Sequence, residues 1–130
     1  MRHLSNREME TFRFVNNYIL ENFSRHISVG EISNQVGMSE IKLYRGFKLI
    51  YKSTIIGLQT RLRMEKAATL LVTDMLVKEV AIEIGYKNSN QFGPQFKKHH
   101  GMTPTAYKAL HSVYPTDIAI YPGDISAAAV

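Results

Sequence analysis

Two segments of this sequence combine basic and polar side chains at helical spacing, and each begins shortly after a glycine, Gly37 or Gly85. In the first segment, which also contains the apolar Ile41, these side chains are Lys42, Tyr44, Arg45, Lys48 and Lys52. In the second segment, they are Lys87, Ser89, Asn90, Gln91, Lys97 and Lys98. Guanidinium, ammonium and amide groups donate hydrogen bonds to phosphate oxygens and to the edges of bases. The chemistry that these residue types favour is recognition of a nucleic acid.

Both segments belong to a pattern that occurs twice. Each copy has an acid-bearing apolar run, a glycine, and then apolar and basic residues at fixed spacing: Glu31, Gly37, Leu43 and Phe47-Lys48, and then Glu79, Gly85, Phe92 and Phe96-Lys97. A short helix, a glycine turn and a second helix with outward polar side chains form a helix-turn-helix, whose second helix enters the DNA major groove. The repetition predicts that one polypeptide reads two successive grooves.

The composition of the chain further limits the classes of partner and of chemistry that it can have. The 130 residues carry a formal net charge of +5 and a pI near 9.5, which favours a polyanionic partner without choosing among DNA, RNA and lipid. No run approaches 18 apolar residues and no secretory leader is recognisable, so we expect a cytoplasmic protein without a membrane partner. The absence of cysteine excludes zinc fingers and thiol nucleophiles.

We expect neither an enzyme nor a cofactor. The sequence shows no paired carboxylates, no nucleophile with a base and no phosphate-cradling glycine loop. Among the five histidines, His99 and His100 are adjacent and point in different directions on a helix, so they cannot bind one metal as an i, i+4 pair would. No metal site is therefore predicted.

The elements that position these side chains read as helices throughout. Capping residues Ser5, Ser28, Ser39 and Thr103 mark four helix starts, each followed by apolar residues at spacings of three and four. The first helix, over about residues 5–23, is expected to bury Phe12, Val15, Ile19 and Phe23. The pattern predicts an all-α fold of about seven helices, with no strands.

Four segments follow from this pattern: residues 1–53 as a first helix-turn-helix subdomain, 54–72 as a linker helix, 73–111 as a second subdomain and 112–130 as a C-terminal tail. The apolar face of the linker shifts along its length, which is expected of a helix packed into one bundle at its start and another at its end. It would be about 28 Å long at 1.5 Å per residue. This is close to the ~34 Å between successive major-groove faces. In the tail, Ile118, Ile120 and Tyr121 are candidates for local packing.

The second half resembles the AraC/XylS family of bacterial transcription regulators. The residues that carry the resemblance are Arg63-Met64-Glu65-Lys66-Ala67, Glu79-Val80-Ala81, Gly85-Tyr86, Phe92, Phe96-Lys97, Gly101-Met102-Thr103-Pro104 and Tyr107. The match covers about residues 19–108. It implies two homeodomain-like three-helix units joined by a long helix, with both recognition helices in adjacent major-groove segments of an asymmetric promoter site. In many members RNA polymerase is a further partner, and many carry a separate sensor or receiver domain.

This chain departs from the family pattern at four places. Ser33 replaces a frequent alanine, Lys52 stands where the second unit has Gly101, and Leu76 replaces a capping serine. The fourth departure is Gly93-Pro94, where members usually carry a long polar side chain at the proline position. Because proline removes a helical N–H, we expect the second recognition helix to be kinked or to begin late.

The resemblance assigns base contacts in the first unit to Ile41, Tyr44 and Arg45. Arg45 can bond guanine O6 and N7 together, and Ile41 can pack on a thymine methyl. In the second unit the helix start presents Ser89, Asn90 and Gln91 to bases, with Asn90 suited to adenine. The phosphate contacts are assigned to six lysines, Lys42, Lys48, Lys52, Lys87, Lys97 and Lys98.

The alternatives remain solvated surface side chains and, for Tyr44, packing on its own helix. With Pro94 in place of a polar residue, the second unit is predicted to contribute more affinity than specificity. The function predicted is sequence-specific binding of double-stranded promoter DNA. The alternative is a helical protein-interaction module, which would bind with weak salt dependence.

Overall fold

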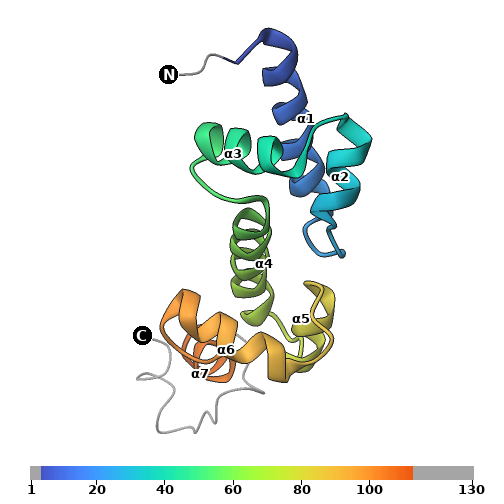
Figure 1. Cartoon of the computed structure of the whole chain (residues 1–130). Coiled ribbons are helices and arrows are strands. Elements are labelled where there is room, and N and C mark those ends of the chain that lie inside the picture. Colours follow the sequence, from blue (N-terminus) through green and yellow to red (C-terminus); the bar gives the residue numbers. More distant parts are fainter. Residues whose placement is uncertain (1–3, 113–130) are drawn as a thin grey trace, which may run out of the picture. The chain divides into compact units, whose positions relative to one another are not determined.

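The structure is a computed structural model that describes residues 4–112, and seven helices make up this part of the chain (Figure 1). They are α1 (Asn6–Asn22), α2 (Val29–Val36), α3 (Glu40–Tyr51), α4 (Ile55–Leu71), α5 (Val77–Glu83), α6 (Ser89–His100) and α7 (Pro104–His111). No strand occurs within residues 4–112. The all-α prediction with two helix-turn-helix pairs is confirmed; the C-terminal tail and its Ile118, Ile120 and Tyr121 lie outside the described residues.

The chain divides into two compact units between Arg63 and Met64, inside α4. Each unit has its own apolar core. The first contains Phe12, Val15, Ile19, Ile27, Ile32, Leu43, Phe47, Ile55 and Leu58, and the second contains Met64, Ala67, Leu71, Val80, Ala81, Ile84, Phe92 and Phe96. The start of α4 thus belongs to the first core and its end to the second, as the shifting apolar face predicted.

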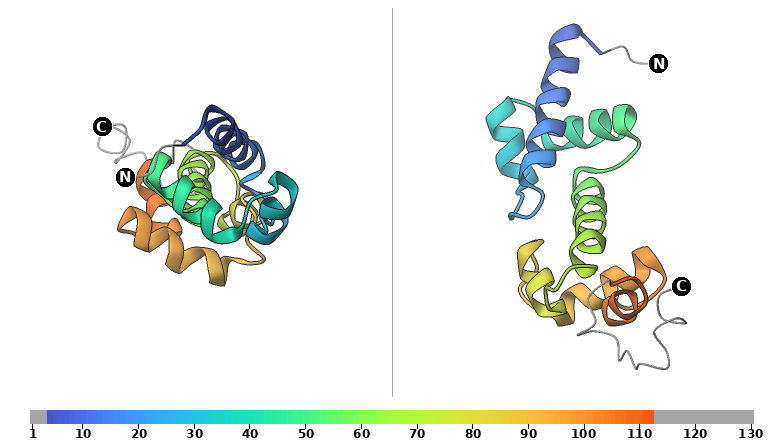
Figure 2. Two further views of the ribbon diagram at one scale, coloured as in Figure 1. Left: turned by 45° about the horizontal axis from the view of Figure 1, so that its top comes forward. Right: turned by 180° about the vertical axis from the view of Figure 1, so that it is seen from behind.

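In the first unit, α1 crosses α3, with α2 beside them (Figure 1, Figure 2). Gly46 permits this crossing, since a Cβ there would lie only 2.1 Å from a ring carbon of Phe12. Phe12, Val15 and Ile19 are fully buried as predicted, but Phe23 is only partly buried. The prediction for Phe23 was wrong because α1 ends at Asn22, which leaves Phe23 as the residue that caps the helix.

The predicted helix starts are confirmed by side-chain caps. Ser5, Ser28, Ser39 and Thr103 each accept a hydrogen bond from the backbone N–H three residues later, all at 3.1 Å. Leu76 supplies no such bond to α5; instead the backbone N–H of Leu76 donates to Glu79 Oε1 at 2.8 Å. The helix still begins there with half of a capping box.

Both helix-turn-helix turns use the same backbone geometry. Gly37 and Gly85 have φ of 69° and 105°, values that glycine adopts without a Cβ clash. The residue after each glycine donates its N–H to a carbonyl five residues back, Met38 to Ser33 (3.0 Å) and Tyr86 to Ala81 (2.9 Å). Ser33 and Ala81 are both buried, so a small side chain fits each helix crossing. The sequence repeat is therefore a structural repeat.

A second structural feature also occurs in both units, where a side chain of the last helix binds the end of the first helix. In the first unit α4 packs on the end of α1, and in the second unit α7 packs on the end of α4. Gln59 Nε2 donates to the carbonyls of Phe23 (3.2 Å) and Arg25 (2.8 Å). In the other unit, Lys108 Nζ donates to the carbonyls of Leu71 (3.3 Å) and Thr73 (2.6 Å). Both donors are at least nine-tenths buried, and each satisfies carbonyls that the end of a helix leaves without partners. These bonds fix the scaffold that holds each recognition helix.

Candidate nucleic-acid interface

Helix α3 presents the predicted base-contacting side chains away from its core. Leu43, Gly46 and Phe47 are buried on one face, so the other positions face outward. Ile41 is 64% exposed and Tyr44 48% exposed, and Arg45 is exposed as well. At this exposure the side chain of Ile41 is accessible to a ligand.

Three of the predicted residues meet at one hollow, which we call the α3 hollow. Its volume is about 360 Å³, and it is lined by Leu4, Phe12, Ser39, Ile41, Lys42, Arg45, Gly46 and Leu49. Ile41, Lys42 and Arg45 therefore share one side of the helix, around an apolar floor that contains Phe12. Gly46 lines the hollow beside the Phe12 ring, which occupies the place of its missing Cβ. Such a surface combines two cations with apolar contact area, which suits a base edge beside a phosphate.

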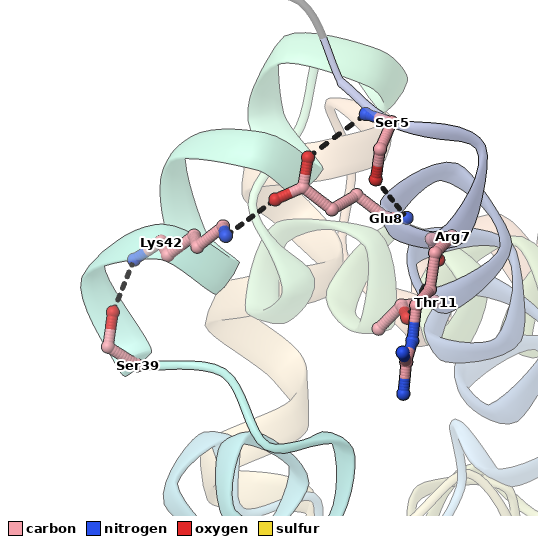
Figure 3. Close-up of polar contacts among 6 residues, drawn as sticks. All are labelled: Ser5, Arg7, Glu8, Thr11, Ser39 and Lys42. Carbon is pink, nitrogen blue, oxygen red and sulfur yellow. Dashed lines mark hydrogen bonds and ion pairs between the residues drawn. The ribbon is translucent and has the colours of Figure 1, made fainter.

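Lys42 has a partner within the protein (Figure 3). Its Nζ lies 2.5 Å from Oε2 of Glu8, on α1. The other carboxylate oxygen of Glu8 accepts the backbone N–H of Ser5 at 3.0 Å, which completes the capping box of α1. The predicted phosphate ligand is thus paired with an acid that the sequence pattern did not connect to it.

The remaining first-unit residues lie on the adjacent strip of α3. Lys48 Nζ is 5.8 Å from the centre of the Tyr44 ring, within reach of a cation–π contact. Tyr44 thus packs on its own helix and is still half exposed, so its role as a base contact stays a prediction. Lys52 is exposed and ends α3 in the left-handed conformation, with φ of 61°. The expected non-glycine cap is confirmed.

Helix α6 begins at Ser89, directly after its cap Asn88, and continues through Pro94 to His100. The expectation of a late start was therefore wrong. Gly93 accounts for this, because a residue before proline is disfavoured in a helix partly through its Cβ, which glycine lacks. The carbonyl of Asn90, four residues before Pro94, receives no N–H from it.

The predicted residues of the second unit do not all share one face. Ser89 and Lys97 line a hollow of about 780 Å³, the α6 hollow, together with Leu76, Val77, Lys78, Gly93, Pro94, Thr103, Pro104 and Thr105. Asn90, Gln91 and Lys98 are exposed on α6 but do not line it. Lys87 lies with Ser89 at a separate hollow on the outer side of α5. Pro94 thus leaves a recess where a long side chain would project.

Sequence reasoning missed three residues at these surfaces. Lys78 is exposed and lines the α6 hollow beside Lys97, so it is a further candidate for a phosphate contact. Glu8 pairs with Lys42, and Gly46 sets how close α3 lies to α1. The acid of a capping box and a glycine within an apolar helix face are ordinary local features. Only the tertiary contact between α1 and α3 gives them a role.

Within the described part of the chain, we find no support for a metal site or for a membrane-spanning helix. Residues 4–112 contain no group of three metal-ligating side chains that could hold an ion. His100 Nε2 instead donates to the carbonyl of Met64 at 3.0 Å, and its ring stacks on Phe96 with centroids 4.4 Å apart. None of the helices within these residues is long and apolar enough to cross a membrane.

Comparison with known proteins places this arrangement in a family. The sequence model of a helix-turn-helix domain matches residues 32–109. An uncharacterised HTH-type transcriptional regulator from the cgkA 5′ region of Pseudoalteromonas carrageenovora is 35% identical over 95 residues, which is 73% of this chain and 57% of the relative. This chain thus spans little more than half the length of that protein.

Solved structures agree. The C-terminal domain of AraT, a response regulator from Geobacillus stearothermophilus, superposes with a TM-score of 0.76 at 27% identity, over 94% of this chain and 99% of that domain. The DNA-binding domain of AdpA, a global transcriptional factor solved with a target DNA, gives a TM-score of 0.71 at 25% identity, over 77% of this chain and 91% of that one.

Proposed function

The chain belongs to the AraC/XylS family of bacterial transcription regulators, whose DNA-binding domain it carries, and we propose that it places α3 and α6 in adjacent major-groove segments of one promoter site. The supporting observation is the structural repeat. Two glycine-hinged helix pairs share the same backbone hydrogen bonds, and each holds a second helix with exposed basic side chains. The AdpA domain, solved in complex with a target DNA, supports DNA as the ligand.

In this proposal α3 is the main reader of sequence. Arg45 bonds guanine, Ile41 contacts a thymine methyl and Tyr44 contacts an adjacent base, while Lys48 and Lys52 bind phosphates. The exposure of these side chains and the shared α3 hollow support this assignment. A good bidentate arginine contact gives about 1–3 kcal/mol of discrimination between bases.

Helix α6 contributes mainly affinity. Ser89, Asn90 and Gln91 lie in its first turn, where the backbone approaches the base edges, and Lys87, Lys97 and Lys98 bind phosphates together with Lys78. No Asp or Glu occurs within α6, and its charged side chains, Lys97 and Lys98, are both cationic. The recess at Gly93-Pro94 presents no side-chain donor to a base, which limits the discrimination available there.

Each segment of the chain has its own role in this proposal. Residues 1–53 and 73–111 act as the two reading subdomains, and residues 54–72 act as the linker between them. The site of action is the cytoplasm, where bacterial promoters lie. A sensor or receiver domain completes the proposal, supported by the greater length of the relative and by the response-regulator neighbour. Contact with RNA polymerase is proposed from the family resemblance alone.

Selection of bound sequences from random duplexes, followed by titration against salt, tests this function. DNA binding predicts enrichment of one asymmetric site and a logarithm of the binding constant that falls by about 0.9 per logarithm of salt for each phosphate neutralised. A protein-interaction module predicts no enriched sequence and little salt dependence. That result would overturn the proposal.

A further inference from the structure

Glu8 lies outside the residues that carry the family match, yet it contacts the recognition helix. The matched region is residues 32–109, whereas Glu8 is in the first turn of α1. Its carboxylate reaches Lys42, which lines the α3 hollow with Ile41 and Arg45 (Figure 3). An acid thus lies at the edge of a surface that would otherwise present two cations to a polyanion.

We infer that Glu8 limits the affinity of the first unit for any DNA duplex, because its carboxylate neutralises the ammonium group of Lys42. This inference rests on the proposed DNA binding. The Glu8–Lys42 pair is electrically neutral, so Lys42 adds nothing to the attraction that draws the domain to any duplex. Contacts to phosphate dominate non-specific binding, whereas base contacts give preference among sequences.

The geometry favours retention of this pair. Glu8 is fixed from two sides, because one oxygen accepts the Ser5 N–H and the other meets Lys42. Its side chain is 19% exposed and that of Lys42 is 37% exposed, so water screens the pair less than it screens two fully exposed groups. The backbone N–H of Lys42 is itself held by Ser39 at 3.1 Å, which fixes the start of the helix that carries it.

Charge arithmetic makes the inference testable through three variants. The pair carries zero net charge in the natural protein, +1 in Glu8→Gln, −1 in Lys42→Gln and zero in the double variant. Glutamine at position 8 can still accept the Ser5 N–H, since Glu and Gln both complete a capping box. The helix start is therefore kept while the charge is removed, and thermal unfolding of each variant verifies this.

Glu10→Gln is the matched control. Glu10 is exposed on the same helix and undergoes the same change of charge. It lines a shallow surface with Arg7, Thr11, Phe14, Gln35 and Val36, which includes no residue of α3. Any gain that comes only from a higher net charge appears equally in this variant.

The experiment measures binding of the full chain to its selected duplex and to a scrambled duplex over a range of salt. An exposed ion pair is worth about 0.2–1 kcal/mol, which is about 1.4- to 5-fold in affinity. We therefore expect Glu8→Gln to bind both duplexes about two- to five-fold more tightly than Glu10→Gln does. Its salt slope should be steeper by about 0.9. The double variant should return to the natural affinity and slope.

Three results would overturn the inference. Equal behaviour of Glu8→Gln and Glu10→Gln would show that Lys42 is not held back, and weaker binding by Glu8→Gln would show that Glu8 assists Lys42. A gain confined to the selected duplex would also contradict it, since it would make Lys42 a base contact. Failure of the natural protein to prefer any duplex would instead reject the proposed function, which keeps the two failures distinct.

Discussion

Gly46 is the position where α3 comes closest to α1, and we expect its replacement by alanine to destabilise the first unit. A Cβ at this position would lie 2.1, 2.7 and 2.8 Å from three ring carbons of Phe12. Favourable carbon contacts are about 3.5–4.0 Å. Because the Phe12 ring is fully buried against α3, the ring or the whole of α3 must shift to admit the new methyl group.

The expected loss follows from two opposing effects. Overpacking of this kind costs about 1–3 kcal/mol, and the three close contacts place this substitution in the upper part of that range, at about 2–3 kcal/mol. Alanine in a helix interior is favoured over glycine by about 1 kcal/mol, which offsets part of the loss. The net prediction for Gly46→Ala is a decrease of about 1–2 kcal/mol in the free energy of unfolding. A shift of α3 would also weaken base readout, because this helix carries Arg45.

Urea unfolding followed by far-ultraviolet circular dichroism measures this loss, and amide exchange in α1 and α3 locates it. The matched control is Phe12→Leu combined with Gly46→Ala, since the smaller side chain makes room for the new methyl group. The double variant should lose less free energy of unfolding than the two single variants lose together, by about 1 kcal/mol or more. A Gly46→Ala protein as stable as the natural one, or a purely additive double variant, would refute the reasoning.

Three further changes test other parts of the structure. Lys52→Gly should stabilise the fold by about 0.5–1 kcal/mol in urea unfolding, because glycine removes the strain of the left-handed cap; its salt slope for DNA should become shallower by about 0.9. Lys108→Met should destabilise the second unit by about 1.5–3 kcal/mol, because the carbonyls of Leu71 and Thr73 lose their charged hydrogen-bond donor. Amide exchange in α4 and α7 at the rates of the natural protein would contradict this. Footprinting with single-base substitutions should show weaker discrimination under the half bound by α6 than under the half bound by α3, and equal discrimination would reject the role given to Pro94.

The helices and turns were predictable because local sequence determines them. Serine and threonine caps marked the starts of four helices, and glycines marked the two sharp turns. The apolar spacing identified the buried faces of α1 and α3. The changing apolar face of α4 predicted that one helix would serve two cores. These signals depend on residues a few positions apart, which a single sequence records directly.

Contacts between distant residues were not predictable in the same way. Glu8 and Lys42 are 34 positions apart, and nothing in the charge pattern distinguishes this pair from other acids and bases. The two capping donors, Gln59 and Lys108, differ in residue type although they perform the same task. Helix α6 also continued through Pro94 because the preceding residue lacks a Cβ, a compensation that the proline alone did not suggest.

The central claim, that α3 reads bases through its exposed face, is tested most directly by repeating the duplex selection with Arg45→Ala. Preference should disappear at one or two neighbouring base pairs, while the rest of the selected site and the salt slope change little. An unchanged preference at every position, or a uniform loss of affinity across all sequences, would contradict it.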